Sequence, residues 1–73
     1  MNTKMMKSGS MIDTAIQQWK QHVSDAEGGI AYCDQALASD LEPWERKEYE
    51  KVKAKHVAEL PALRNHLEYL LTL

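Results

Sequence analysis

The length, composition and charge of the chain limit it to one thin domain. It has 73 residues, a single cysteine and a formal net charge of −2. A chain this short buries too little apolar surface to be stable alone, and such domains depend on disulfides, a metal or a partner. Cys33 has no second cysteine to pair with, and its thiol fits a reducing, cytoplasmic setting. No apolar run is long enough to span a membrane, so oligomerisation is the expected route to stability.

Residues 1–10 differ in character from the rest of the chain. They lack hydrophobic periodicity, contain two lysines and no acid, end in Ser-Gly-Ser, and lack the apolar core of a secretory signal. We expect a disordered leader, either vector-derived and placed ahead of a native start at Met11, or a native arm. Residues 11–73, the single helical hairpin domain predicted below, carry seven basic and eleven acidic residues, a net charge of −4. This acidity argues against a phosphate-binding protein.

A heptad repeat predicts a first helix over residues 12–39. Its members are Ile12, Ile16, Trp19, Val23, Ala26, Ile30, Cys33 and Leu37. This spacing keeps one narrow seam on a single helix face, as in supercoiled bundles. The repeat stays in phase across Gly28 and Gly29, which favours one continuous helix over a bend or break, although each glycine costs about 1 kcal/mol relative to alanine. Gly29 flanks the seam, so its missing side chain leaves room for a bulky group such as Trp44 or Tyr49.

The chain is expected to turn within residues 38–43. Ser39 or Asp40 is suited to cap the second helix, and Pro43 is tolerated in a first turn because no intrahelical N–H bond is lost there. A connection this short makes the two helices antiparallel. Residues 44–55 are strongly helix-forming, with opposite charges at helical spacing in the pairs Glu42/Arg46, Glu48/Lys51 and Glu50/Lys53.

The apolar stripe of the second helix is broader and less regular than that of the first. It consists of Tyr49, Val52, His56, Leu60, Leu63, Leu67 and Leu70. One extra four-residue step near His56 is a stutter, which locally straightens a supercoil. Pro61 removes the N–H that would bond the carbonyl of Val57 and crowds the preceding turn. Good helix formers flank Pro61, so a helix kinked there is favoured over two separate helices.

These patterns predict an all-α fold, an antiparallel helical hairpin of two long helices. Helix two presents more apolar surface than helix one covers, and five side chains need a further partner: Trp19, Leu41, Trp44, Val57 and Leu71. A homodimer that forms a four-helix bundle meets this need with one kind of contact. The predicted interface and core residues are Ile16, Trp19, Val23, Ile30, Leu37, Trp44, Tyr49, Val52, Leu60, Leu63, Leu67 and Leu70.

The histidines do not predict a metal site. No acid precedes His22, His56 or His66 by three residues, as the di-metal helical bundles require. His22 with Asp25, and His56 with Glu59, stand three residues apart, but a boundary histidine near an acid is common. We interpret His56 as a marker of the stutter or as a semi-buried, hydrogen-bonded interface contact.

No catalytic or cofactor-binding residues are predicted either. Cys33 occupies a seam position with no histidine nearby in the sequence, so we interpret it as core packing rather than as a nucleophile. The sequence contains no glycine-rich phosphate loop, zinc spacing or nucleophile elbow. An enzyme, a cofactor and a small-molecule substrate are therefore not expected.

Two surface features remain as candidates for binding. Lys47, Lys51 and Lys55 form a row on the second helix that could touch phosphates, but acids are interleaved and a solvated face is favoured. The aromatic residues are not grouped as a stacking platform for bases. Trp44, at the end of the hairpin, is the better candidate for an exposed anchor to another protein.

The segments MIDTAIQQWK (residues 11–20) and WERKEYE (residues 44–50), within a 63-residue stretch starting at Met11, resemble the tiny early-region proteins of lambdoid bacteriophages. Those proteins are encoded between the exonuclease and excisionase genes. The resemblance implies an accessory protein in the cytoplasm of the host bacterium that modulates host physiology or the choice between lysis and lysogeny. It supplies no catalytic residues. We expect a non-catalytic, dimeric helical module that binds a host or phage protein. The alternative is a small nucleic-acid-associated regulator that uses the Lys47/Lys51/Lys55 face.

Overall fold

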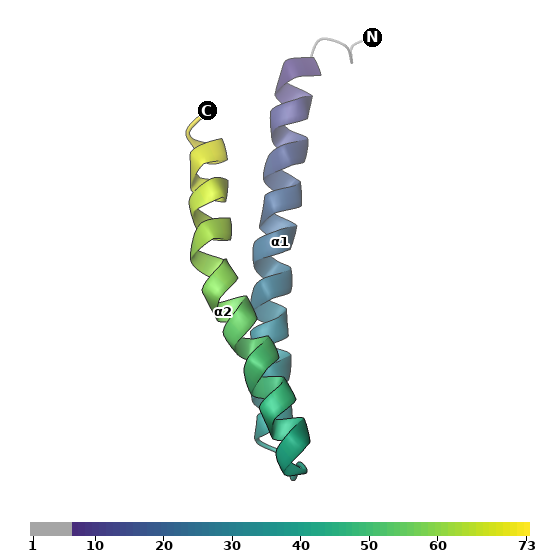
Figure 1. Cartoon of the computed structure of the whole chain (residues 1–73). Coiled ribbons are helices and arrows are strands. Elements are labelled where there is room, and N and C mark those ends of the chain that lie inside the picture. Colours follow the sequence, from purple (N-terminus) through teal and green to yellow (C-terminus); the bar gives the residue numbers. More distant parts are fainter. Residues whose placement is uncertain (1–6) are drawn as a thin grey trace.

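Two antiparallel helices joined by a short turn make up the computed structural model, which describes residues 7–73, with side chains from residue 11 onward. Helix α1 spans Lys7–Leu37 and helix α2 spans Pro43–Leu71. The helices lie against each other near the turn and separate toward the two termini (Figure 1). The extents of 58 × 22 × 14 Å describe a long hairpin only one helix thick. The predicted all-α hairpin is confirmed, and the four-helix bundle, which needs a second copy, stays a prediction.

The first helix is longer at its start than the sequence predicts. It begins at Lys7 rather than at residue 12, since extending an existing helix by a turn needs no new nucleus. Residues 7–10, which were assigned to the leader, thus belong to α1, while residues 1–6 lie outside the described residues. α1 runs unbroken through Gly28 and Gly29, neither of which has a positive φ. The continuous helix favoured by the heptad phase is confirmed.

The residue that caps α2 differs from the two predicted, and one of those two closes α1 instead. The Ser39 hydroxyl donates to the carbonyl three residues earlier at 2.6 Å, so Ser39 closes the end of α1. The N-cap of α2 is Glu42, in an extended conformation directly before Pro43, and its N–H donates to the Glu45 carboxylate at 2.9 Å. Capping of α2 by Ser39 or Asp40 is therefore wrong, because proline at the first helical position makes its immediate predecessor the cap.

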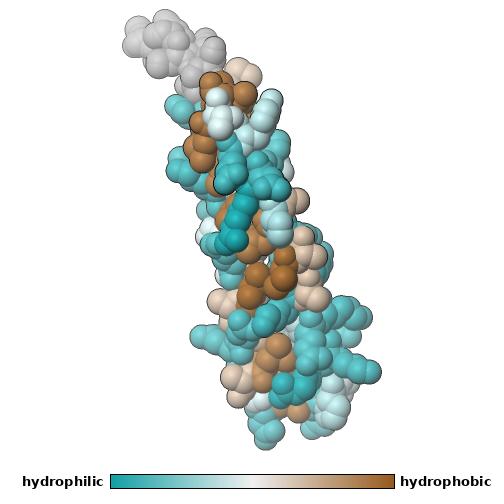
Figure 2. Space-filling view, turned by 90° about the vertical axis from the view of Figure 1, so that its left-hand side faces the viewer, coloured by the Kyte–Doolittle hydropathy of each residue, from teal (hydrophilic) through white to brown (hydrophobic). Residues whose placement is uncertain are grey.

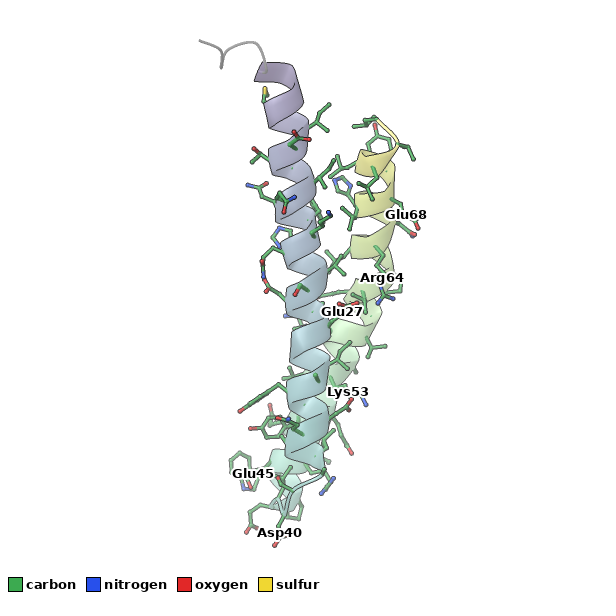
Figure 3. The ribbon with its side chains drawn as sticks, turned by 180° about the vertical axis from the view of Figure 1, so that it is seen from behind. Glu27, Asp40, Glu45, Lys53, Arg64 and Glu68 are labelled. Carbon is green, nitrogen blue, oxygen red and sulfur yellow. The ribbon has the colours of Figure 1, made fainter. Side chains whose placement is uncertain are left out.

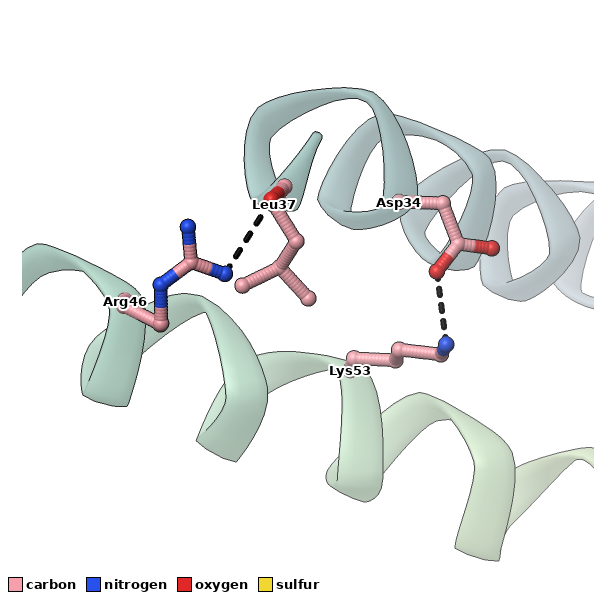
Figure 4. Close-up of polar contacts among 4 residues, drawn as sticks. All are labelled: Asp34, Leu37, Arg46 and Lys53. Atoms are coloured by element: carbon pink, nitrogen blue, oxygen red, sulfur yellow. Dashed lines mark hydrogen bonds and ion pairs between the residues drawn. The ribbon is translucent and has the colours of Figure 1, made fainter. Parts of the chain in front are cut away.

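A side chain from α2 also satisfies the end of α1. The Arg46 guanidinium donates to the Leu37 carbonyl at 3.1 Å (Figure 4). The last carbonyls of a helix have no partner within the helix, and a cationic donor there opposes the helix dipole. The sequence pattern paired the Arg46 side chain with Glu42 instead; the bond between these two residues is a backbone one, from the Arg46 N–H to the Glu42 carbonyl at 3.0 Å. The side-chain bond of Arg46 joins the start of α2 to the end of α1 across the turn.

Pro61 lies inside α2 and does not end it. The helix changes direction in its middle, in the light green part of the ribbon around residue 60, and its second half leans away from α1 (Figure 1). Proline leaves the carbonyl of Val57 without its helical donor and crowds the preceding turn, which bends a helix. The kinked continuous helix is the arrangement that the sequence favours.

The core of this hairpin is very small. Among residues 11–73, only Ala26 and Cys33 are buried, at 4% and 1% exposure. Cys33 is therefore core packing, as interpreted from its seam position. Every other apolar side chain in this range keeps part of its surface in water.

Candidate functional site

Most of the predicted interface residues are half-buried in the single chain. These are Ile16, Trp19, Val23, Ile30, Leu37, Tyr49, Leu60, Leu63, Leu67 and Leu70. Trp44 and Val52 are exposed, at 66% and 42%. Apolar side chains form an interrupted stripe that follows the length of the molecule (Figure 2). Each helix therefore covers only part of the stripe of the other.

The seam between the helices has two unlike edges, one of which is charged. On this polar edge, Lys53 of α2 pairs with Asp34 of α1 at 2.6 Å, and Arg64 pairs with Glu27 at 2.7 Å (Figures 3 and 4). The hydrogen bond that Lys53 donates to the Asp34 carboxylate, and then the charge of that carboxylate, raise the pKa of Lys53. All four side chains are more than a third exposed, and such pairs contribute little to stability. They join α1 and α2 at two levels along the seam.

The charge pairs predicted within α2 occur only in part. Lys51 and Glu48 approach to 3.6 Å, as their spacing predicts. Lys53 instead contacts Asp34 on the other helix, so its predicted pairing with Glu50 is wrong. A long lysine side chain at the edge of a seam reaches a neighbouring helix as easily as a residue one turn away.

The opposite edge carries rings in place of ion pairs. This aromatic–histidine edge consists of Trp19, His22, Tyr32, Tyr49, His56 and His66. Trp19 meets His22 edge-on at 5.0 Å between ring centroids and meets His66 at 4.1 Å, while Tyr32 and Tyr49 lie 6.1 Å apart. A hydrogen bond with Tyr32 is the main cause that raises the pKa of Tyr49. Across residues 11–73, no acid–base pair joins α1 to α2 along this edge.

Gly29 and His56 form the closest approach of the two helices on this edge. A Cβ built on Gly29 would lie 2.6 Å from Nε2 of His56, so only glycine lets the imidazole rest against α1. The sequence identified the space at Gly29 correctly but assigned it to Trp44 or Tyr49. That assignment is wrong, because seam spacing within one helix does not fix which residue of the other helix lies opposite.

The His56 ring is not fully satisfied by its neighbours. Its Nδ1 atom is buried without a hydrogen-bond partner, and the nearest acid oxygen, Oε1 of Glu59, lies 3.9 Å away. That distance is too long for a hydrogen bond, so the predicted hydrogen-bonded contact is wrong for this atom. A buried ring nitrogen without a partner is costly, and it lies where the seam opens into a groove.

A groove of about 410 Å³ lies beside His56 between the two helices. It is lined by Trp19, His22, Asp25, Ala26, His56, Glu59 and Leu63. The two histidine–acid pairs noted in the sequence, one on each helix, therefore line the same groove. Within residues 7–73, no three His, Cys, Asp or Glu side chains are placed to hold a metal ion. The groove combines an apolar floor with hydrogen-bond donors and acceptors at its rim.

A second hollow of about 310 Å³ lies further along α1, toward its start. It is lined by Met11, Thr14, Ala15 and Gln18. On a helix, Ala15 and Gln18 lie on the same flank as His22 and Asp25, at successive steps of three or four residues. The two hollows therefore follow one another along one flank of α1. This flank could not be predicted from hydrophobic periodicity, because its members belong to neither apolar stripe.

The remaining surface candidates are all exposed. Lys47, Lys51 and Lys55 face water along α2, and Lys51 is engaged with Glu48. Trp44 projects at the turn end with two thirds of its surface exposed, as an anchor residue would. Within residues 7–73, neither helix carries an apolar stretch long enough to cross a bilayer.

Comparison with family models, with curated proteins and with solved structures gives no match for this chain. The resemblance to the small early-region phage proteins is therefore untested and stays a prediction.

Proposed function

We propose that this chain is a non-catalytic accessory protein that acts as a dimeric helical protein–protein interaction module. In this proposal, two hairpins associate into a four-helix bundle, and the bundle binds a host or phage protein. Following the sequence resemblance, its place is the cytoplasm of an infected bacterium, where it modulates host physiology or the choice between lysis and lysogeny.

The observation that supports the dimer is the imbalance between core and surface. Only two small side chains are buried in residues 11–73, and a single core of that size does not stabilise a domain. Half-buried seam residues such as Ile16, Leu63 and Leu67 would become buried if a second hairpin packed against them.

Sedimentation equilibrium over a range of protein concentrations tests the dimer. The proposal expects a mass of about twice 8.4 kDa at micromolar concentration. A helical, folded species that stays at the single-chain mass up to high concentration would remove the dimer.

The alternative function is that of a small nucleic-acid-associated regulator. It is favoured by one observation, the exposure along one face of α2 of Lys47, Lys51 and Lys55.

A gel shift at low salt separates the two functions. Because phosphate contacts release counterions, true binding by this row weakens steeply as salt rises. Salt-sensitive retardation at micromolar protein, lost when the three lysines are changed to glutamine, would favour the regulator. If the protein does not retard the nucleic acid, the result supports the interaction module.

A further inference from the structure

The aromatic–histidine edge is the part of the hairpin that is left open. The polar edge is bridged by the Asp34–Lys53 and Glu27–Arg64 pairs. The other edge has no such bridge, opens into the groove beside His56, and holds the buried Nδ1 atom that lacks a partner. An interface that forms on this edge would cover apolar surface without breaking an existing ion pair.

The shape of this edge suits a helix better than a small molecule. A volume of about 410 Å³ lies within the range of small-ligand pockets, roughly 300–1,000 Å³, but this groove is open to one side. The hollow at Met11, Ala15 and Gln18 continues the same flank of α1. An elongated, open and largely apolar surface of this kind accepts side chains from another helix.

The polar groups on this edge are complementary to a copy of themselves. In a two-fold dimer the same patch occurs on both partners, so it must supply both donors and acceptors. His22, which is exposed, offers ring nitrogens, and Asp25 and Glu59 offer carboxylates, all lining one groove. A strongly basic or strongly acidic partner would leave one of these two sets unpaired.

We infer that a second copy of this chain docks on the aromatic–histidine edge, with the groove between Trp19 and His56 at the centre of the interface. This inference rests on the proposed dimer and names the surface that makes it. The polar edge then faces outward, and Trp44 at the turn end, 66% exposed, stays accessible for a target protein.

Gln17 and Gln18 provide a matched test of this surface. Both are exposed, adjacent and chemically identical, but Gln18 lines the α1 hollow whereas Gln17 points about 100° away around the helix. Gln18→Glu places two extra negative charges in the proposed interface, one from each copy. We expect it to raise the dimer dissociation constant about tenfold, while Gln17→Glu changes it by no more than about twofold.

A second pair of variants and a second readout make the result independent of one substitution. Asp25→Lys, at the groove, should weaken the dimer, whereas Ser24→Lys on the outer side should not.

The fluorescence of Trp19 provides the second readout. In a Trp44→Phe background, Trp19 emission should shift to longer wavelength on dilution as the second copy leaves the groove. Circular dichroism shows whether each variant keeps its helices, and a variant that unfolds is replaced by the other pair.

The outcomes separate the two proposals. A wild-type chain that sediments as a monomer overturns both the dimer and this surface. A dimer that neither Gln18→Glu nor Asp25→Lys weakens, with Trp19 emission unchanged on dilution, overturns the surface but leaves the dimer intact. A greater loss with Gln17→Glu or Ser24→Lys would place the interface on the other side of α1 and also overturn the inference.

Discussion

The two edges of this hairpin differ in what each contributes. The polar edge joins α1 and α2 by two exposed ion pairs that align the helices but bury almost nothing. The aromatic–histidine edge brings rings and one glycine into close contact and leaves a groove and a buried nitrogen unsatisfied. One edge is thus complete in the single chain, and the other has the features of a surface that is completed on association. In the single chain, the contacts that join the two helices by charge and the surface left open thus lie on opposite sides of the same seam.

Replacing Ile30 by Asp should have the largest effect, because Ile30 lies on the seam between the two edges and supports both. It is half-buried in the single chain, and burying an unpaired charge costs several kcal/mol, on the order of 3 or more. We expect loss of helical circular dichroism or a monomeric, weakly helical chain. Ala31→Asp, one residue away and exposed, is the matched control and should keep its helices. An unchanged sedimentation profile for Ile30→Asp would remove the seam as the basis of the fold.

The two neighbouring glycines test the aromatic–histidine edge directly. Gly29→Ala places a methyl group 2.6 Å from the His56 ring, and we expect a loss of about 1–3 kcal/mol of stability from overpacking. Gly28 has nothing within 4 Å, so Gly28→Ala should stabilise the helix by about 0.5–1 kcal/mol. Chemical denaturation measures both changes.

A double-mutant cycle assigns the penalty at Gly29 to its proposed cause. If His56 is the clash, Gly29→Ala combined with His56→Ala should lose much less stability than the sum of the two single changes. Additive losses, or equal effects of alanine at positions 28 and 29, would contradict the close approach of α1 and His56.

Breaking the polar edge should have a smaller effect. Arg64→Met removes the ion pair with Glu27, whose side chains are 55% and 50% exposed, and should cost about 0.5 kcal/mol. The loss should shrink in high salt because exposed pairs are screened. Lys51→Met, which removes the longer 3.6 Å contact with Glu48 within α2, serves as the control. A loss from Arg64→Met greater than that from Gly29→Ala would reverse the ranking of the two edges.

The smallest effect on stability is expected at the turn end, which belongs to neither edge. Trp44→Ala removes a side chain that is 66% exposed, so stability should change by about 0.5 kcal/mol or less. Capture of a target protein should fall by about tenfold or more if Trp44 is its anchor. Thermal melts and a pull-down from host lysate measure the two effects, and equal loss of both would make Trp44 a core residue.

Periodicity within each helix was sufficient to predict the elements of this fold. The unbroken heptad phase across Gly28 and Gly29 predicted one helix there, and helix formers on both sides of Pro61 predicted a continuous second helix. The cap was missed because Glu42 is a less common capping residue than Ser39 or Asp40. It caps here only because Pro43 follows it.

The contacts between the helices were harder to predict than the helices themselves. Which residue lies opposite Gly29 depends on how α2 is aligned against α1 after the turn, where the Arg46 bond and the cross-helix ion pairs join the two helices. The groove combines His22 and Asp25 of α1 with His56 of α2, residues more than 30 positions apart. No pattern within one helix brings them together. The sequence therefore identifies these histidines and acids as candidate groups but does not predict that they line one groove.

The central claim is that this hairpin depends on a second copy for its stability. Thermal melts followed by circular dichroism over a hundredfold range of protein concentration test it most directly. If folding is coupled to dimerisation, the Tm should rise by about 10 °C across that range, because mass action favours the bound state and the unfolding enthalpy scales with chain length. A single cooperative Tm that does not change with concentration would contradict the account.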